Sequence, residues 1–411
     1  MRHIYTSVDI GSDSVKVIVC ELCKNKLNLL GASSVKSKGI KKGVINDPNL
    51  ASKSIKQAVN EVEEMLGIEI KKVLVTVPSY FAEYKSFSEE MSHDGSLVNS
   101  DTIVKLMQQV ITNNNPKKVE IASVQVMNFK VDGKEIKDPK DMPATTLEVK
   151  GILSYIPREN LYSVVGLLEQ IGISVVDVCL GPVADYYTYK SKEYDNKKGV
   201  VINIGSELTT ISLVTHGIIV KSSIIQLGGK SVDNDIAYIY KIDNATATSL
   251  KEKFAFAHKN GASTNEITKK KNIVNDEIEI NQYELSEVAM ARLEEILNLA
   301  KKEISALTNI ENDYIIVTGG TSNMIGLSKL ASEVLGPKVS IENIKLLGVR
   351  NNKFSTAVGT IIYFANKLKI RGQDYSMLNK NEIDDMISNA RSRSVREGNV
   401  LDKVFNYFFS E

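Results

Sequence analysis

The sequence predicts a duplicated α/β fold with two lobes. Residues 5–19 and 199–213 follow one plan, in which an apolar strand, a polar residue, Ile-Gly-Ser and a short polar turn lead into an alternating strand. The polar residues that open the two turns, Asp9 and Asn203, are 203 − 9 = 194 residues apart. After each copy, apolar strands alternate with amphipathic helices, which is the order that builds layered α/β domains. Two halves of similar design are therefore expected.

The first half supplies one lobe and an insertion. Residues 4–19 predict two strands around the first turn, and an amphipathic helix follows Asp47 and stops at Gly67. A buried strand over residues 71–78 comes next. Clusters of turn residues then interrupt short helix and strand patterns, until the α/β order resumes with a helix over residues 159–171. The expected boundaries are residues 1–84 and 158–196 for the first lobe core and 85–157 for an inserted subdomain.

The second half repeats this order after its own turn. Paired strands over residues 200–214 precede a strand that ends in Gly228 and Gly229. A polar region follows, then a long amphipathic helix and an apolar strand over residues 313–320. The expected boundaries are residues 197–236 and 303–366 for the second lobe core and 237–302 for an insertion in it.

The C-terminal part predicts a polar linker and a short terminal helix. Residues 367–398 hold few large apolar side chains, which is typical of a flexible linker. Residues 399–411 predict an amphipathic helix. Docking of this helix onto the body of the chain is one interpretation, and insertion into a membrane interface is the other, which the three phenylalanines favour. The apolar arc of the helix consists of Val400, Leu401, Val404, Phe405, Phe408 and Phe409.

Composition excludes several classes of protein. The 411 residues are 43% hydrophobic and include 51 basic and 50 acidic side chains, so no overall field would attract nucleic acid. Three cysteines are too few for a disulfide framework and indicate a reducing compartment. We expect no signal peptide, and no apolar run approaches the roughly 18 residues of a membrane span.

The glycine turns predict a site for phosphate groups. Glycine lets backbone N–H groups approach a phosphate closely, and a neighbouring hydroxyl adds a donor. Asp9, Gly11 and Ser12 fit this role in the first turn, with Lys16 as a partner for negative charge. Similar turns end the strands near Gly228 and over residues 317–327. Together these turns indicate a cleft that backbone approaches closely.

The same motifs carry a resemblance to a known superfamily. The segments DIGSDSVK, INIG, GGKSVDNDIA and IIVTGGTSNMIGL resemble those of actin, the heat-shock chaperone ATPases and the sugar kinases. Within that superfamily, the residues around GIKKG (39–43) and FSTAVGTIIYFA (354–365) are similar to the FtsA family of bacterial cell-division proteins. The resemblance implies an actin-like fold whose two lobes hold ATP and Mg²⁺ between them, with the extra subdomain in the first lobe.

The resemblance also implies a role for each matching residue. The first phosphate loop would contain Asp9, Gly11, Ser12 and Lys16, with Asp9 near the metal ion. The second loop would contain Asn203, Gly205 and Ser206, and the nucleotide would also approach Gly228 and Gly229. Lys251 is expected to reach the ribose, and the adenosine would be framed by Gly319, Gly320 and Met324.

Some residues depart from the family pattern. Asn203 stands where relatives have an aspartate, and Ser206 and Glu207 stand where they have glycines. Asp13 is a further acid in a phosphate loop, and Thr248 replaces a ribose-binding glutamate. An amide can orient a water molecule, but it cannot accept a proton. We therefore expect no enzyme beyond a very slow ATPase.

The function implied by the resemblance is that of a cell-division scaffold. It would form filaments with itself, bind the C-terminal tail of FtsZ through residues 237–302, and contact later division proteins. The terminal helix would attach it to the cytoplasmic face of the membrane at the septum, as a peripheral protein. A pilus-assembly actin-like adaptor and a sugar or acetate kinase are the alternatives.

Overall fold

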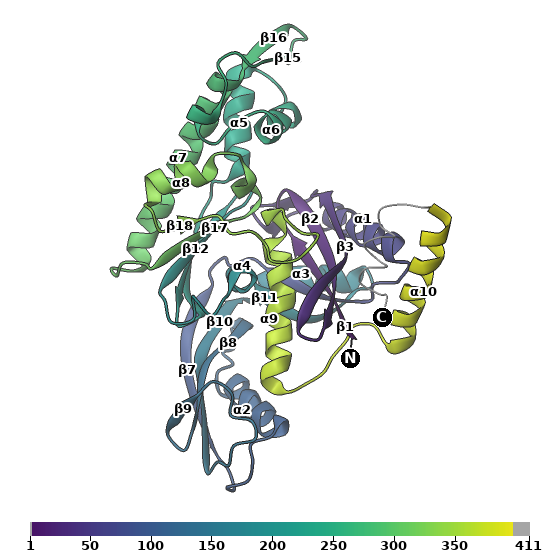
Figure 1. The fold of residues 1–411 in the computed structure, drawn as a ribbon, viewed down its shortest axis with the longest axis vertical. Coiled ribbons are helices and arrows are strands. Elements are labelled where there is room, and N and C mark those ends of the chain that lie inside the picture. The colour runs from purple at the N-terminus through teal and green to yellow at the C-terminus, as the bar shows by residue number, and fades with distance from the viewer. Residues whose placement is uncertain (1, 398–411) are drawn as a thin grey trace.

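The computed structural model describes residues 2–397, with side chains described up to residue 388. Its body consists of two lobes, each built on a five-stranded sheet, with a smaller subdomain attached to the first lobe (Figure 1). The six apolar residues predicted to meet a membrane, Val400 to Phe409, lie outside the described part. No helix in residues 2–397 is both long and apolar enough to cross a bilayer.

The first lobe has the sheet order β11-β6-β1-β2-β3. Strand β1 is the central strand and runs antiparallel to β2 and parallel to β6, so the first glycine turn joins the ends of two inner strands, β1 and β2. The strands are β1 (Arg2–Ile10), β2 (Ser14–Cys23), β3 (Lys26–Lys36), β6 (Lys72–Val77) and β11 (Ser174–Leu180). Helices α3 (Arg158–Gln170) and α4 (Gly181–Tyr189) flank β11 in the chain.

Helix α1 (Pro48–Leu66) confirms the expected amphipathic helix of the first lobe. The Asp47 side chain caps it by accepting a hydrogen bond from the Leu50 backbone N–H, and Pro48 occupies the first turn, where its missing N–H costs nothing. Gly67 ends the helix in the left-handed conformation, with φ of 67°. The apolar face packs on β3 and β2, which places the helix on one side of the sheet.

The second lobe repeats this design. Its sheet has the order β14-β13-β12-β17-β18, and β12 is antiparallel to β13 and parallel to β17, as β1 is to β2 and β6. The second glycine turn joins β12 to β13, so it occupies the same place in its sheet as the first turn does. The strands are β12 (Gly199–Ile204), β13 (Thr209–Thr215), β14 (Ile218–Ile225), β17 (Tyr314–Thr318) and β18 (Val339–Ser340).

The inserted subdomain of the first lobe has a core of its own. One helix covers a four-stranded sheet of order β7-β10-β8-β9, and buried side chains such as Phe87, Leu106 and Leu147 lie between them. The elements are β7 (Glu83–Ser92), α2 (Ser100–Asn113), β8 (Val119–Val131), β9 (Lys134–Ile136) and β10 (Thr146–Pro157).

Helices dominate the upper part of the second lobe in Figure 1, and a hairpin of β15 and β16 projects from its end. The boundaries expected at residues 236 and 303 fall inside two continuous helices. The elements are α5 (Gly229–Tyr240), α6 (Asn244–Lys253), β15 (Ile267–Lys271), β16 (Glu277–Asn281), α7 (Gln282–Leu307) and α8 (Leu327–Leu335).

Helices α4 and α9 (Ser355–Arg371) join the lobes at the centre of the molecule. They cross at Gly359, where a Cβ would lie 1.7 Å from the Ala184 carbonyl oxygen, so a larger residue has no room. A second junction is the buried Gln125 side chain, whose amide exchanges hydrogen bonds of 3.0 and 2.8 Å with the Ile219 backbone on β14. The lobes are thus connected by close packing and by buried polar contacts.

Residues 367–388 are not the flexible linker that their polar composition predicted. Helix α9 continues to Arg371, and the backbone N–H of Met377 donates to the Ile4 carbonyl oxygen at 2.9 Å. Helix α10 (Lys380–Glu397) follows. Four apolar side chains of the segment, Met377, Leu378, Ile383 and Met386, are buried, and the others are half-buried. Their spacing covers an edge of the first lobe, which a count of apolar residues does not reveal.

Candidate functional site

A cleft of about 810 Å³ lies between the two lobes. Both glycine turns line it, together with the start of α5, the end of α6 and the turn that follows β17. The cleft brings together nearly all residues that the sequence predicted for nucleotide binding. Its predicted residues are Asp9, Gly11, Ser12, Lys16, Asn203, Gly205, Ser206, Gly229, Lys251, Gly319, Gly320 and Met324. Gly228 lies beside Gly229 at the start of α5.

The first turn carries a buried ion pair. Asp9 and Lys16 are direct partners across β1 and β2, and the Lys16 Nζ lies 3.0 Å from Asp9 Oδ2. The other oxygen of Asp9 accepts a hydrogen bond of 3.1 Å from the Thr76 hydroxyl on β6. A Cβ at Gly11 would lie 2.8 Å from the Lys16 Nζ, so glycine leaves room for this ammonium group. The pair places one positive charge and one carboxylate at the floor of the cleft.

The tips of the two turns offer free backbone donors. Within residues 2–397, the N–H groups of Ser12, Asp13, Ser206 and Glu207 have no hydrogen-bond partner. Successive N–H groups in a tight turn form a concave site for anions. Because both turns line the same cleft, these donors are available to one phosphate chain.

Asn203 is held in one orientation by a residue that the sequence reasoning missed. Its Nδ2 donates to Asp185 Oδ2 at 2.7 Å. The carbonyl oxygen of Asn203 therefore turns toward Gly319, where a Cβ would lie 2.3 Å from it. Gly319 also has a φ of 91°, a conformation that side chains other than glycine rarely adopt. The amide thus presents an acceptor beside the second turn.

Asp185 is a buried carboxylate on α4, with 4% of its surface exposed. It accepts hydrogen bonds from the hydroxyls of Ser355 and Thr356 at the start of α9, at 3.1 and 2.8 Å. The pKa of Asp185 is raised to about 6, because burial and, to a smaller extent, the nearby Asp9 charge outweigh the lowering effect of its three donors. The one sequence signal was an acid within the apolar stretch LGPVADYY (180–187). A buried carboxylate is therefore hydrogen-bonded directly to the Asn203 side chain.

Tight backbone packing shapes the part of the cleft near α5. The Gly229 N–H donates to the Gly205 carbonyl oxygen at 2.9 Å, and a Cβ at Gly229 would lie 2.4 Å from the Thr321 hydroxyl. Lys251, expected to reach a ribose, is buried and lies 2.8 Å from Asp233 Oδ1. It also donates to the Gly229 carbonyl oxygen at 3.2 Å. Its ammonium group thus lies beside the paired glycines.

The two unexpected acids of the turns are both neutralised by basic partners. Asp13 pairs with Lys36 on β3. Glu207 accepts hydrogen bonds from the Lys230 ammonium at 2.7 Å and from the Lys42 backbone N–H at 2.5 Å. Burial by itself would raise the pKa of Glu207, but these donors outweigh burial and hold the pKa below its ordinary value. Neither acid is an unpaired charge.

The cleft fits a nucleotide that brings its own Mg²⁺. No cluster of three metal-binding side chains exists in the part of the chain that the structure describes. Mg²⁺ is commonly bound through one or two carboxylates, water and the substrate's phosphates, so such a cluster is not required. Asp9 is the carboxylate at the floor of the cleft that suits this role, and the free N–H groups of both turns suit the phosphates.

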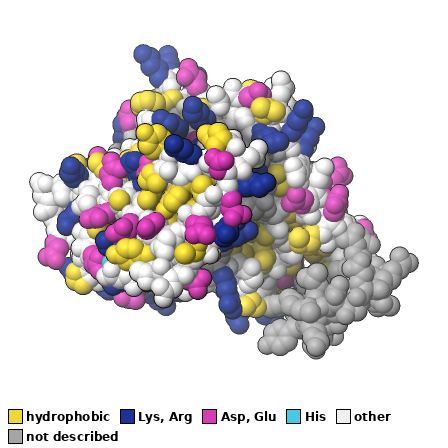
Figure 2. All heavy atoms as spheres, turned by 90° about the horizontal axis from the view of Figure 1, so that it is seen from above, with side chains coloured by type: hydrophobic (Ala, Val, Ile, Leu, Met, Phe, Trp, Pro, Cys, Tyr) yellow, Lys and Arg dark blue, Asp and Glu magenta, His cyan; other side chains and the backbone are white. Residues whose placement is uncertain are grey.

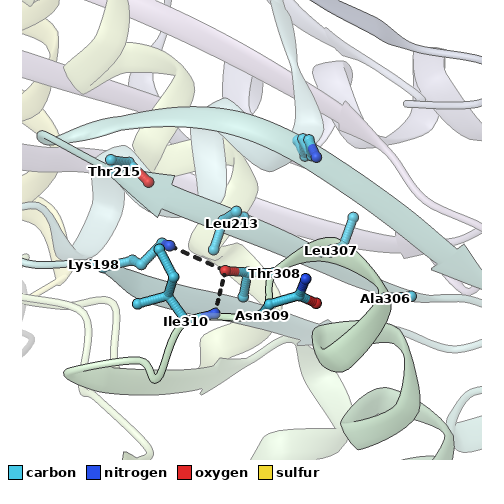
Figure 3. A pocket seen from close by; sticks show the side chains of 9 residues that line it. Lys198, Leu213, Thr215, Ala306, Leu307, Thr308, Asn309 and Ile310 are labelled. Carbon is cyan, nitrogen blue, oxygen red and sulfur yellow. Dashed lines mark hydrogen bonds between the residues drawn. The ribbon is translucent and has the colours of Figure 1, made fainter.

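A second hollow, of about 600 Å³, lies on the second lobe away from the glycine turns (Figure 3). Residues at the end of α7 and on β13 line it, and the Lys198 Nζ donates to the Thr308 hydroxyl at 3.0 Å. Its wall mixes apolar side chains with polar ones such as Thr215 and Lys221, and it holds none of the predicted site residues. The chemistry of the molecule is therefore concentrated in the cleft between the lobes.

On the face seen in Figure 2, acidic and basic side chains are interspersed, and hydrophobic side chains gather in small groups between them.

Comparisons with known proteins converge on one family. The family model described as cell division protein FtsA matches residues 200–359, and the SHS2 domain inserted in FtsA matches residues 83–154. The cell division protein FtsA of Bacillus subtilis is 30% identical over 378 residues, which cover 90% of this chain and 86% of that one. The FtsA of Enterococcus hirae is 29% identical over 368 residues, covering 88% and 83%.

Solved structures confirm the actin-like fold. A chain of a PilM-PilN type IV pilus biogenesis complex has a TM-score of 0.58 at 14% identity, covering 88% of this chain and 98% of that one. MreB5 of Spiroplasma citri bound to ADP has a TM-score of 0.55 at 15% identity, covering 90% and 98%. At such low identity these likenesses establish the fold alone.

Proposed function

The chain belongs to the family of the cell division protein FtsA, and from this premise we propose that it is a nucleotide-binding scaffold that links FtsZ filaments to the membrane at the division site. The observation that carries the proposal is the cleft between two duplicated lobes. Its two glycine turns, whose tips carry backbone N–H groups without a hydrogen-bond partner in residues 2–397, line one space of about 810 Å³. The homologues are named as division proteins and not as metabolic enzymes, which favours a scaffold over a kinase.

The proposed ligand is ATP with Mg²⁺. The free N–H groups of the turns would hold its phosphates, and Asp9 would meet the metal ion through oxygen or water. Gly319, Gly320 and Met324 would border the base and sugar. The related fold of MreB5 has been solved with ADP and with AMPPNP, which supports this choice of ligand. Calorimetric titration of the full chain with ATP and Mg²⁺ tests it directly, and no heat of binding at millimolar nucleotide would contradict it.

Turnover of the nucleotide should be very slow. Asn203 presents a carbonyl oxygen that can orient water but cannot take a proton, and Asp185 contacts the amide nitrogen of Asn203 on the side away from that oxygen. The bound nucleotide would therefore act in assembly. A phosphate-release assay measures the rate, and sustained turnover at the 1–100 s⁻¹ or so of kinases would contradict a scaffold and favour the kinase alternative.

The proposed FtsZ site lies on the layer of helices added to the second lobe. Exposed apolar side chains there would suit the apolar part of a short peptide tail. They include Tyr238, Ile239, Ile267, Ile273 and Val274. A pull-down with the FtsZ C-terminal peptide is the deciding experiment, because a pilus-assembly adaptor would not retain it. A peptide of the same composition in scrambled order is the control.

The membrane would be reached through residues 399–411. Each short amphipathic helix binds weakly, so filament formation by the body would strengthen attachment through avidity. Co-sedimentation with anionic liposomes compares the full chain with one that ends at Glu397. If both sediment equally well, this role of the terminal helix is wrong. The subdomain at residues 83–157 is the proposed contact for neighbouring copies and later division proteins.

A further inference from the structure

Glu207 joins the two lobes at the mouth of the cleft. It belongs to the second turn, yet its Oε2 accepts a hydrogen bond of 2.5 Å from the backbone N–H of Lys42 in the first lobe. The Ser12 hydroxyl of the first turn lies close enough to this carboxylate to help lower its pKa. Lys230 at the start of α5 donates to Oε1 at 2.7 Å. Only 10% of the Glu207 side chain is exposed, so the carboxylate is enclosed by donors from both lobes.

The first lobe contributes these donors through a short hairpin. Strands β4 (Ile40–Lys41) and β5 (Val44–Ile45) hold the GIKKG segment against the second lobe. The Lys42 ammonium donates to the Gln226 side chain at 2.6 Å, and the Gly43 N–H donates to the Ser12 hydroxyl oxygen at 2.7 Å. The hairpin thus positions the donors around Glu207 and also fixes the rotamer of Ser12.

The donor set is one that a phosphate group would use. A hydroxyl, a backbone N–H and a lysine ammonium are ordinary phosphate ligands. In this chain they surround a carboxylate, and one of them, the Ser12 hydroxyl, belongs to the first turn, which lines the cleft. A terminal phosphate that reached Ser12 would meet the Glu207 charge in an enclosed site, where like charges repel strongly.

We propose that Glu207 is a built-in anion that competes with the terminal phosphate of a nucleoside triphosphate, so that this chain still binds the proposed ATP, but more weakly than the corresponding diphosphate. The carboxylate supplies the contact between the lobes that a terminal phosphate would otherwise make. The lobes are therefore in contact here without a terminal phosphate. This inference rests on the proposed binding of nucleotide in the cleft. It makes Glu207 a specificity-determining residue.

The test compares ADP and ATP affinities of the full chain by calorimetry at one Mg²⁺ concentration. For the wild type we expect ADP to bind about tenfold more tightly than ATP. Glu207→Gln keeps the shape and a carbonyl acceptor for the Lys42 N–H but removes the charge. It should lower the ADP preference by about tenfold, mainly through tighter ATP binding. A tenfold change in affinity corresponds to about 1.4 kcal/mol.

Two further variants separate the contact from a general charge effect. Asp13→Asn removes the other acid of the turns, whose partner Lys36 belongs to the same lobe, and should change the preference by less than about threefold. Glu193→Gln removes one charge from a side chain that is 70% exposed and outside the cleft. It should leave the preference as in the wild type. Melting temperatures show that every variant is folded.

The outcomes are distinguishable. If wild type and Glu207→Gln show the same ratio of ADP to ATP affinity, or if Asp13→Asn changes it as much as Glu207→Gln does, the inference about Glu207 is wrong while nucleotide binding stands. If the wild type binds neither nucleotide, the proposed function of the cleft fails as well.

Discussion

Replacing Asp185 with asparagine tests the energetic cost of the buried carboxylate. Burial raises its pKa to about 6 from an ordinary value of 3.8, against the effect of donors such as Asn203 and Thr356. Because the folded chain holds this proton more tightly than the unfolded chain does, the free energy of unfolding falls as pH rises from about 4 to about 6. The difference between the two pKa values corresponds to about 3 kcal/mol lost at neutral pH.

Asparagine keeps the size of Asp185 and an acceptor for the Asn203 amide, but it cannot ionise. We expect the free energy of unfolding of Asp185→Asn to rise by about 2 kcal/mol relative to the wild type between about pH 4.5 and about pH 8. Urea titrations followed by circular dichroism at the two pH values measure this change. Asp384→Asn is the control, since Asp384 is an exposed acid on α10. A pH-independent difference between Asp185→Asn and the wild type would refute the reasoning.

Three further predictions follow from close contacts. Asn203→Asp would place a second carboxylate at the 2.7 Å contact with Asp185 and should lower the free energy of unfolding at neutral pH by about 1–3 kcal/mol. In urea titrations, the double variant with Asp185→Asn should recover most of this lost stability. Gly229→Ala would bring a Cβ to 2.4 Å from the Thr321 hydroxyl and should weaken nucleotide binding about tenfold in calorimetry. The control is Gly166→Ala on α3, where a Cβ would meet no atom within 4 Å. It should raise the free energy of unfolding by about 0.5–1 kcal/mol and leave nucleotide binding unchanged. Gly359→Ala, with its Cβ 1.7 Å from the Ala184 carbonyl oxygen, should destabilise the chain by about 1–3 kcal/mol or more, and an unchanged melting temperature would show that α4 and α9 can separate at no cost.

Local patterns predicted the elements that depend on neighbours in the chain. Helix α1 could be predicted because its cap at Asp47, its apolar spacing and its stop at Gly67 are all short-range features. The two glycine turns were evident for the same reason, since each is a contiguous motif between two strands. The order of strands around them then confirmed the expected duplication.

Composition was a poor guide to the segment after α9. Residues 372–388 are mostly polar, yet Met377 and Met386 are buried against the first lobe. A few apolar side chains suffice when a preformed surface lies beside them. The prediction of a linker relied on the number of apolar residues, which contains no information about that surface.

Asp185 shows why part of the site could not be predicted. Its hydrogen-bond partners Asn203, Ser355 and Thr356 are 18, 170 and 171 residues away in the chain. From the sequence, Asn203 indicated only that a carboxylate was missing from the second turn. The fold places another carboxylate directly behind it, from a helix that no motif connects to the turn.

The sequence by itself determined the two glycine turns, their duplication and the family that their motifs resemble, because glycine conformation and strand periodicity are encoded within a few residues. Only the tertiary structure decided what the charges near those turns do. Glu207 lies 165 residues from Lys42, and their contact exists because the two lobes close on one another. The strength of an electrostatic interaction depends on distance and burial, which are properties of the folded chain.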